Sequence, residues 1–571
     1  MNRLKYIIIL LVLLTIYIVS VIYLDDVKIL AGNITPIVNM SALWGLVAVG
    51  LATSVLLLIS TSHTFSFLPT NKGEANRRNI YLLLAVLVLF RIAAFFLSPD
   101  FIQYMHVWPD SNVYLGEMQS VIQDPIYRFF DRKSPVYTTW LALNHLTFGE
   151  IMGSQGSDVY FGATVFLNDI VPPIIMQNII GVFSALICFH IFSRINIRLA
   201  YAVTLLAFIN PVTLALENAI LRESLALFFI LSGFAVFLKA IEQRKNIYGF
   251  LSGALFVLAY LTRPELIIIY ILLCLVLFIY ALFQRQRIWK TAILFYLPLI
   301  ITMLFAMYSL NHEYAEQRYG GRFFTALYGI KSKCWFYESK TFPELIRNIQ
   351  KKAMKCEEER YAPCDAPLTT TSLIRIGILE EIEKYIQANG LQNSKEEVLD
   401  QIFIDVVKNN PSCYIQSVLT NMAYILIHNV ENTTPILYDR DNYWISQNWN
   451  YYVSPKMLVL YEGNNTYYKY IVYFFRTIEL YTTQKVLSPF FFIGSIIILI
   501  TIRKGLFTNG SNTNLLMACT LLFSWVHLLF LSLMAGPVAR FAYLVSPFTF
   551  AIEIIGVMGS YRWLKSRFLN Q

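Results

Sequence analysis

Charged residues are scarce in this chain, and their scarcity decides its class. They make up 14% of the sequence, whereas soluble globular proteins carry about a quarter. Hydrophobic residues make up 57%, so a soluble protein is excluded and an integral membrane protein is predicted. The sequence also lacks zinc-finger spacing, an RNA-binding signature and a soluble basic domain. The net charge of +9 therefore does not indicate nucleic-acid binding.

Hydrophobic runs predict an all-α polytopic membrane protein with about twelve transmembrane helices. The runs lie near residues 6–24, 42–60, 79–97, 171–193, 198–215, 222–240, 248–261, 265–283, 291–310, 485–502, 514–534 and 541–560. The stretch 248–283 either turns fully outside or bends at Pro264. The first run lacks a small-residue cleavage site, so it is expected to be retained as a helix.

Lysine and arginine set the predicted orientation of these spans. With the N-terminus inside, the short inside loops are rich in Lys and Arg and nearly free of acids, while the first outside loop, residues 98–170, is acidic. The predicted domains are an N-terminal hairpin with its loop (1–78), a transmembrane core (79–310), an external domain (311–484) and C-terminal helices (485–571).

The external domain is too long for a linker, so it is expected to fold. One amphipathic helix is predicted over 371–388, with Gly390 as its stop, and a second from a capping box at Ser394 to a stop at Pro411. Residues 412–429 are apolar with scattered polar side chains, which predicts a helix at the membrane edge.

An aromatic-rich stretch, residues 437–452, follows in the same domain. It has two interpretations, which stay open. It is either part of an interfacial aromatic belt or a platform on which a sugar or polymer acceptor stacks.

Cysteine positions agree with the predicted topology. Three cysteines lie in spans as apolar filler, and the other four, Cys334, Cys356, Cys364 and Cys413, all lie in the external domain. An even number there indicates two disulfides in an oxidising compartment. We favour Cys356–Cys364 and Cys334–Cys413 among three pairings. Metal binding is disfavoured because the sequence has no Cys-x-x-Cys and no nearby His pair.

The leading catalytic candidate is an acid in the first outside loop. Asp110 follows Trp108-Pro109, and Tyr114 and Glu117 come after it at helical spacing. A loop aspartate is most often only a solvated acid. Asp110, however, is expected at the N-terminal end of a helix along the membrane, where the helix dipole favours its charge. There it can accept a proton from a hydroxyl nucleophile.

A second group of charges lies at the outer ends of the fifth and sixth spans. Glu217, Arg222 and Glu223 belong to it, and Arg222 with Glu223 has the alternative interpretation of a mutually neutralising pair. Arg91 in the third span is expected to be buried or to reach the outer interface. Asp110 and Glu223 are the acids considered as its partner.

Two further arginines are expected on the outer face. Arg263 comes just before Pro264, and Arg540 comes just before the last span. A guanidinium group suits a phosphate because it donates a forked pair of hydrogen bonds. A lone arginine at a span end is also explained by snorkelling to the interface.

Five short motifs occur in the order typical of one family. They are Asp110 with Tyr114; Ser134-Pro135-Val136-Tyr137 through Leu141-Ala142 to Phe148-Gly149; Asn210-Pro211 before Glu223-Ser224-Leu225; Leu261-Thr262-Arg263-Pro264; and Arg540-Phe541 before Pro547. On these residues the chain resembles the GT-C superfamily of membrane glycosyltransferases, in the branch of protein O-mannosyltransferases and aminoarabinose transferases. It departs from the family pattern at Ser111, where a second acid is usual, and at Ser134, where a double proline is usual.

The resemblance implies transfer of a sugar from a polyprenyl-phosphate donor to a hydroxyl acceptor, with inversion at the anomeric carbon. It implies Asp110 as general base, or as the group that orients the acceptor, with Arg263 and Arg540 on the donor phosphate. The residues expected to contact sugar or acceptor are Tyr114, Glu117, Tyr137, Glu217, Arg222 and Glu223, of which Glu223 has the alternative role of orienting Arg222.

The implied partners follow from the same reaction. They are the polyprenyl-phosphate sugar, membrane lipids, and an acceptor that is a lipid, a protein or a glycan. No nucleic acid is expected. No cofactor is firmly predicted, no metal ligand is assigned, and the need for a divalent metal stays open.

Two rival functions remain open at this stage. A polysaccharide polymerase or ligase would also use a lipid-linked donor. A flippase or transporter is expected to show internal repeats and charges near the membrane midplane, but here no convincing repeat is visible and the charges cluster at outer ends.

Overall fold

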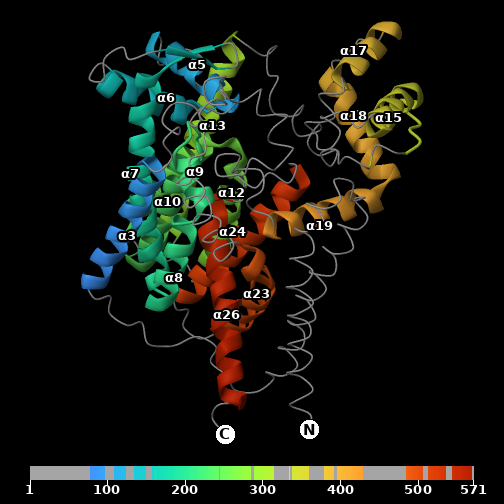
Figure 1. Cartoon of the computed structure of the whole chain (residues 1–571). Helices are drawn as coiled ribbons and strands as arrows, with labels where there is room; N and C mark the ends of the chain where they lie inside the picture. Colours follow the sequence, from blue (N-terminus) through green and yellow to red (C-terminus); the bar gives the residue numbers. More distant parts are fainter. Residues whose placement is uncertain are drawn as a thin grey trace, which may run out of the picture. The chain divides into compact units, whose positions relative to one another are not determined.

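The described part of the chain folds mainly into helices and includes one short β-hairpin (Figure 1). The computed structural model describes residues 77–96, 109–123, 134–149, 157–160, 163–243, 245–283, 289–313, 334, 337–358, 378–390, 395–427, 484–505, 512–534 and 543–568. These residues fall into two compact units. The membrane unit holds the described residues between 77 and 313, between 484 and 527, and from 543 onward. The disulfide lobe holds those between 334 and 427 and between 528 and 534.

Apolar helices dominate the membrane unit. They are α3 (Arg77–Phe96), α7 (Leu167–Ser193), α8 (Ile197–Phe208), α9 (Pro211–Glu217), α10 (Glu223–Gln243), α11 (Asn246–Thr262), α12 (Ile267–Phe283), α13 (Trp289–Glu313), α23 (Gln484–Gly505) and α26 (Ser546–Phe568); α24 (Asn512–Met534) runs from this unit into the lobe. Within the described ranges, 4 helices are long and apolar enough to cross a membrane, and shorter apolar helices match the other predicted spans there. The predicted spans 6–24 and 42–60 lie outside the described residues, so the count of twelve stays a prediction.

Prolines break two of the predicted hydrophobic runs. The run 198–215 was expected to be one span, but it divides into α8 and α9 at Pro211, whose ring and missing N–H interrupt a helix. Within the stretch 248–283 the chain turns back at Pro264, which is the full turn among the two predicted alternatives. Tyr270 of α12 lies level with Gly253 and Phe256 of α11. Farther along α12, Phe278 meets Trp289 at the start of α13, close to Thr291, which Gly249 of α11 contacts, so α12 runs antiparallel to α11. At the turn, Arg263 has extended backbone with φ −142° and ψ 106°, and a short 3-10 turn, η3 (Pro264–Leu266), leads into α12. At both breaks, backbone N–H and C=O groups lose their partners within a helix and need other hydrogen bonds.

Aromatic rings fill the centre of the membrane unit, where α7, α10, α24 and α26 meet. The ring of Phe548 on α26 lies 5.5 Å from that of Phe234, 5.1 Å from that of Phe523 and 6.0 Å from that of Phe192, centroid to centroid. All four side chains are buried. In a bilayer, such close packing contributes to helix association, because lipid tails are as apolar as the helices.

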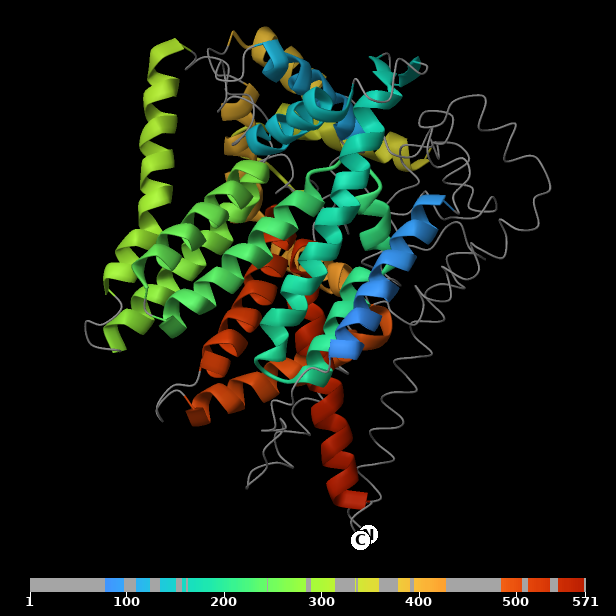
Figure 2. The same ribbon diagram turned by 90° about the vertical axis from the view of Figure 1, so that its left-hand side faces the viewer.

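Figure 2 shows α10, α11 and α13, in green, packed beside one another.

Two glycines allow α23 and α26 to pack backbone against backbone. A side chain at Gly494 of α23 would overlap the carbonyl oxygen of Ile552, and one at Gly556 of α26 would overlap that of Phe490. Each glycine therefore receives a carbonyl of the opposite helix. Small residues at helix interfaces permit this close approach in membrane proteins.

The first outside loop, 98–170, contains more regular structure than the sequence predicted. It includes α5 (Pro109–Gln123), α6 (Pro135–Asn144), a π turn, η2 (His145–Gly149), and an antiparallel hairpin of β1 (Ser157–Tyr160) and β2 (Ala163–Phe166). The hairpin corrects the all-α expectation. Its strands pair Ser157 with Phe166 and Tyr160 with Ala163. At four residues each, they are too short to give a period-2 signal in the sequence.

The disulfide lobe contains the predicted amphipathic helices. Its helices are α15 (Pro343–Glu358), α17 (Ile378–Ala388), α18 (Lys395–Asn409) and α19 (Pro411–Ile427). The predicted stop at Gly390 is confirmed, because its φ of +57° is the left-handed conformation that ends many helices. The predicted apolar face of α18 is also confirmed. Its side chains Val398, Leu399, Ile402 and Val406 are all buried in the core of the lobe.

A buried aspartate organises the polar part of the lobe. The carboxylate of Asp405 accepts hydrogen bonds from the hydroxyls of Ser339 at 2.5 Å and Tyr337 at 3.1 Å, and from the amide of Asn409 at 2.5 Å. Burial and the charge of Asp405 raise the pKa of Tyr337 above its ordinary value. The phenol therefore stays protonated and remains a donor at neutral pH.

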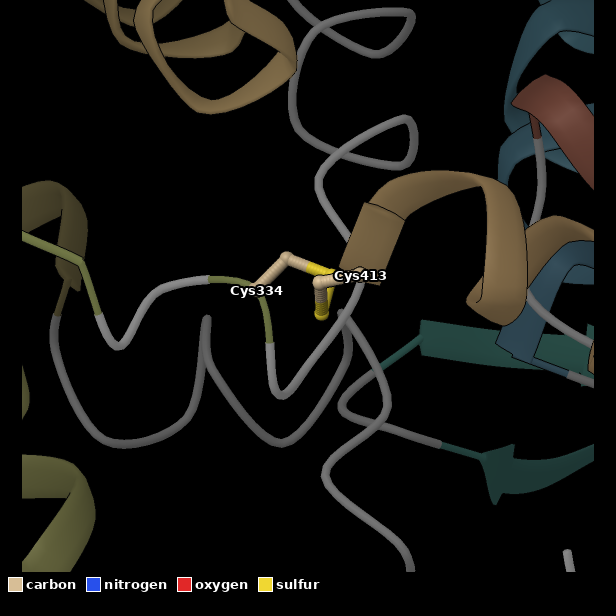
Figure 3. The surroundings of a disulfide bond; sticks show 2 residues. All are labelled: Cys334 and Cys413. Carbon is tan, nitrogen blue, oxygen red and sulfur yellow. A yellow bond between two sulfur atoms is a disulfide. The ribbon is translucent and has the colours of Figure 1, made fainter. Parts of the chain in front are cut away.

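One of the two expected disulfides lies within the described residues. Cys334 and Cys413 are bonded and close a loop with a sequence separation of 79 residues (Figure 3). Cys364 of the second expected pair lies outside the described residues, and Cys356 belongs to α15. The predicted filler cysteines Cys188, Cys274 and Cys519 are free and buried.

Candidate functional site

Helix α5 brings the predicted base to a break in the membrane helices. Asp110 lies in the first turn of α5 after Pro109, a favourable first helical residue, so the predicted helix start is confirmed. The next residue, Ser111, is buried, and its hydroxyl donates to the backbone carbonyl of Ile220 at 2.8 Å. Ile220 belongs to the α9–α10 turn, residues 218–222. The first turn of α5 is therefore anchored on this turn.

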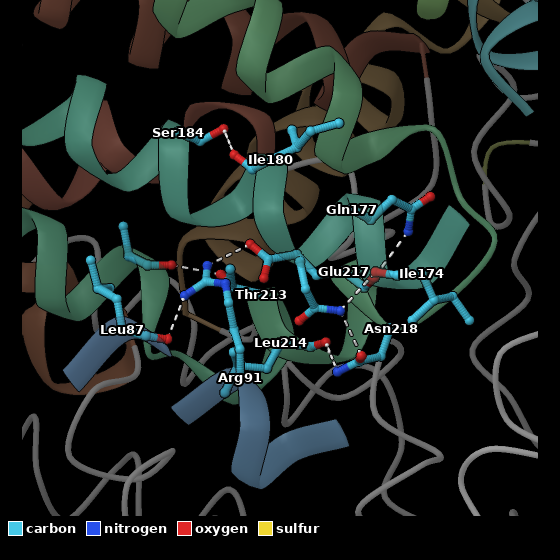
Figure 4. A network of polar contacts seen from close by, with 12 residues as sticks. Leu87, Arg91, Ile174, Gln177, Ile180, Ser184, Thr213, Leu214, Glu217 and Asn218 are labelled. Carbon is cyan, nitrogen blue, oxygen red and sulfur yellow. Dashed lines mark hydrogen bonds and ion pairs between the residues drawn. The ribbon is translucent and has the colours of Figure 1, made fainter. Parts of the chain in front are cut away.

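Amide side chains of α7 bind the α9–α10 turn and the end of α9 by hydrogen bonds. Gln177 donates from its amide nitrogen to the carbonyls of Glu217 at 2.9 Å and Ala219 at 2.7 Å, and its amide oxygen accepts from the hydroxyl of Tyr137 at 2.9 Å. Asn178 donates to the side-chain oxygen of Asn218 at 2.9 Å. Figure 4 shows Gln177, Glu217 and Asn218 of this network. These bonds satisfy carbonyls that a helix break would otherwise leave unpaired.

A buried ion pair fixes the end of α9. Nη2 of Arg91 on α3 lies 2.8 Å from Oε1 of Glu217, with 4% and 0% of the side chains exposed (Figure 4). Nη1 of Arg91 also donates to the carbonyl of Leu87 at 3.1 Å. Arg91 is thus buried, which was one of the two predicted alternatives. Its partner, however, is Glu217 and not Asp110 or Glu223, the acids considered from the sequence. A charge of either sign is costly in this setting unless it is paired.

Gly181 makes room for that carboxylate. A Cβ at Gly181 of α7 would overlap the carboxylate of Glu217 and lie 2.7 Å from its Oε2. We expect Gly181→Ala to displace Glu217 from Arg91 and to lower the free energy of unfolding by about 1–3 kcal/mol, as overpacking does. Thermal unfolding of the purified protein in detergent measures this. Gly116→Ala on α5 is the matched control, because nothing lies within 4 Å of its added methyl group. Equal melting temperatures for the two variants would contradict the expected overlap.

Four alternating charges form a second cluster where α10 begins and α11 ends. Nη1 of Arg263 lies 3.2 Å from Oε1 of Glu223, and Nε of Arg263 donates to Oε1 of Glu265 at 2.7 Å. Nη2 of Arg222 lies 3.7 Å from the same oxygen of Glu265. Both charges of the predicted Arg222–Glu223 pair have partners across the cluster. Glu223 binds Arg263, and Arg222 faces Glu265.

Aromatic rings join this cluster to α5 and α6. The guanidinium carbon of Arg222 lies 5.9 Å from the ring centroid of Tyr114, a cation–π arrangement. The Tyr114 ring meets that of Tyr137 edge-on at 5.2 Å. At the start of α6, the hydroxyl of Ser134 donates to the carbonyl of Thr262 at 2.5 Å. Ser134, where the family pattern has proline, thus ties α6 to the residue before Arg263.

The structure brings most of the predicted site residues together. Side chains of Tyr114, Tyr137, Glu217, Arg222, Glu223 and Arg263 surround the α9–α10 turn, and Asp110 joins them through the backbone of α5. Glu117 lies half-buried on α5. Arg540 lies outside the described residues. Among the described side chains, no three His, Cys, Asp or Glu groups gather as a metal site.

The side chains of the site differ in how much of their surface is exposed. Tyr137, Glu217 and Arg263 have no exposed surface, whereas 11% of the Arg222 side chain is exposed. The predicted sugar contacts of Tyr137 and Glu217 stay predictions, and here both side chains bind protein groups. Arg222 is thus the more exposed of the two guanidinium groups of this cluster.

Sequence reasoning missed Gln177 and Glu265 as members of the site. Gln177 had a signal, because Gln177-Asn178 places two amides in an otherwise apolar span, where polar groups usually have a structural or functional role. Glu265 directly follows Arg263-Pro264 in the sequence but was not among the predicted site residues. Its contact with Arg222 depends on the turn of the chain at Pro264.

These features define an integral membrane protein with a polar site at one end of its apolar helices. No protein-family model and no curated protein matches the sequence. Among solved structures, the Archaeoglobus fulgidus oligosaccharyltransferase tethered with an acceptor peptide matches with a TM-score of 0.39 and 12% identity, over 86% of this chain and 51% of that chain. The oligosaccharyltransferase AglB from the same organism, in complex with an inhibitory peptide and a dolichol-phosphate, matches with a TM-score of 0.39 and 13% identity, over 86% and 52%.

A third match is ArnT from Cupriavidus metallidurans bound to undecaprenyl phosphate, with a TM-score of 0.31 and 12% identity, over 86% of this chain and 79% of that one. The chain thus spans about half the length of the oligosaccharyltransferase structures. At these TM-scores, no inference about fold or activity rests on the likeness.

Proposed function

We propose that this protein is a membrane glycosyltransferase. It transfers a sugar from a polyprenyl-phosphate donor to a hydroxyl acceptor on the extracytoplasmic side, with inversion at the anomeric carbon. The observation that carries the proposal is the bond between Ser111 and the carbonyl of Ile220. It joins the helix turn that contains Asp110 to the segment that leads into Arg222 and Glu223, which supports a site that combines this acid with a guanidinium group.

Asp110 is the general base in this proposal. It takes the proton from the acceptor hydroxyl as the acceptor oxygen forms its bond to the anomeric carbon. The bond between that carbon and the phosphate oxygen breaks, and its electron pair leaves with the lipid phosphate. The first turn of α5 favours a charged carboxylate before the proton arrives.

Guanidinium groups stabilise the charge that develops on the departing phosphate. The motif resemblance assigns this role to Arg263 and Arg540. Because Arg263 is enclosed between Glu223 and Glu265, it acts through the orientation and field of the cluster. Arg222 offers the exposed guanidinium surface, so we assign direct contact with the phosphate to Arg222 together with Arg540.

The proposed side of the membrane rests on charge and chemistry. Lysine and arginine are enriched in the loops at the other ends of the helices, including the Arg194–Glu242 pair near the end of α10. Nucleotide sugars are confined to the cytoplasm, so an extracytoplasmic transferase needs a lipid-borne donor. The disulfide of the lobe agrees with an oxidising compartment.

The test is a transfer assay with the purified full chain in nanodiscs. A panel of polyprenyl-phosphate sugars is offered with hydroxyl-bearing lipid, peptide and glycan acceptors, and release of polyprenyl phosphate is measured together with the anomeric configuration of the product. We expect release that depends on an acceptor and a product of inverted configuration. The same protein is also placed in vesicles. Movement of the lipid-linked sugar from one leaflet to the other without bond cleavage would overturn the proposal in favour of a flippase.

A further inference from the structure

Gln177 uses both of its N–H donors and its amide oxygen in hydrogen bonds at the α9–α10 turn. A glutamine amide has two N–H donors and an acceptor oxygen. Both donors are directed at backbone carbonyls, those of Glu217 and Ala219, and the oxygen accepts the hydroxyl of Tyr137. The Gln177 side chain has no exposed surface. It therefore links α6 to the turn by contacts with protein alone.

Tyr137 continues this link toward the accessible part of the site. Its ring meets that of Tyr114 edge-on at 5.2 Å and stacks on Trp140 at 5.5 Å. Tyr114 in turn lies beneath the guanidinium of Arg222 at 5.9 Å. Arg222 is thus held twice, by the backbone of the turn that Gln177 binds and by a ring that Tyr137 supports.

We propose that Tyr137 and Gln177 are positioning residues that together hold the α9–α10 turn and set the place of the Arg222 guanidinium. The inference rests on the proposed function only for its effect on turnover, since the effect on the turn is conformational. It gives Tyr137 a role different from the sugar contact predicted from the sequence. The hydroxyl acts through Gln177 because both side chains are fully buried.

The turn also provides a direct reporter of its own order. The amides of Asn218, Ala219 and Leu221 each donate a hydrogen bond within this segment, at 3.1, 3.4 and 2.7 Å. Amide hydrogen exchange of such groups follows local opening. Exchange in the turn therefore measures the effect of Gln177 and Tyr137 without any assay of activity.

Tyr137→Phe is the test variant, because it removes one hydroxyl and keeps the ring contacts. Tyr270→Phe is its matched control. Tyr270 is also fully buried, its hydroxyl also donates to one partner, the carbonyl of Phe295, and its ring also meets an aromatic neighbour edge-on. Gln177→Leu is a second test variant, because it removes all three bonds of the amide.

Hydrogen exchange of a peptide covering residues 211–223 is compared by mass spectrometry in nanodiscs. We expect exchange in the turn to rise roughly three- to tenfold in Tyr137→Phe, the size of effect that one lost hydrogen bond gives, and further in Gln177→Leu. Tyr270→Phe is expected to leave this peptide unchanged. Unchanged exchange in Tyr137→Phe, or an equal rise in Tyr270→Phe, would overturn the inference.

Steady-state kinetics supplies the second readout. We expect Tyr137→Phe to lower kcat severalfold with little change in the KM for the donor, while Tyr270→Phe keeps both. Equal loss of kcat in the two variants would assign Tyr137 to general stability and overturn the positioning role. If the wild-type protein shows no transfer at all while the turn still responds to Tyr137→Phe, the proposed function fails and the conformational link stands.

Discussion

Asp110→Asn is expected to lower the rate of sugar transfer by about a hundredfold to ten-thousandfold, the usual contribution of a general base. The amide keeps the size of the side chain but cannot take up the proton of the acceptor hydroxyl. Because Asp110 lies in the first turn of α5, the change also removes a favourable charge from the helix N-terminus. That loss costs only about 0.3–1 kcal/mol, so the folded protein is retained. Initial rates at saturating donor measure the effect.

Glu242→Gln is the matched control for this variant. It makes the same acid-to-amide change in a partly exposed pair with Arg194, near the end of α10 remote from the site. We expect wild-type rates from it and a similar melting temperature for both variants. An Asp110→Asn protein that transfers sugar at the wild-type rate would remove Asp110 from the mechanism.

The second large effect is expected on stability. Arg263 has no exposed surface and binds two carboxylates, so Arg263→Met takes the guanidinium away from Glu223 and leaves Glu265 with Arg222 at 3.7 Å. Breaking a buried ion pair by removing one partner costs about 3–5 kcal/mol. We expect a loss of that order in the free energy of unfolding, measured by denaturant titration in detergent.

Two further variants make this expectation specific to burial. Arg194→Met breaks the partly exposed Arg194–Glu242 pair and is expected to cost at most about 1 kcal/mol. Adding Glu223→Gln and Glu265→Gln to Arg263→Met removes the carboxylate charges that Arg263 had balanced. The triple variant should therefore regain part of the lost stability, because the effects of mutations within one charge network do not add. A loss as small in Arg263→Met as in Arg194→Met would show that the cluster is not a buried electrostatic unit.

The helices of this fold were predictable because their cause is local. Long apolar runs predict spans wherever the bilayer is the solvent, and Pro264 and Gly390 act on the backbone that contains them. The break at Pro211 was missed because the apolar pattern continues through it, although the missing N–H of proline was visible in the sequence. The strands β1 and β2 depend on pairing with each other, which a single short segment does not reveal.

The composition of the site was predictable, but its pairings were not. Motif order placed Tyr114, Arg222, Glu223 and Arg263 in one region. Which acid meets which base depends on tertiary packing. Arg91 and Glu217 are 126 positions apart, and Arg263 and Glu223 are 40 apart. A sequence shows the charges available to a site, while the distances between them arise only when the helices assemble.

The glycine contacts between α23 and α26 limit how these two helices can move relative to each other. Each helix has a carbonyl seated in the notch of its neighbour, so neither slides along nor rolls over the other without a steric collision. The two helices are therefore expected to move as one unit. If the proposed function holds, a gap for the lipid tail of the donor is expected between other helices.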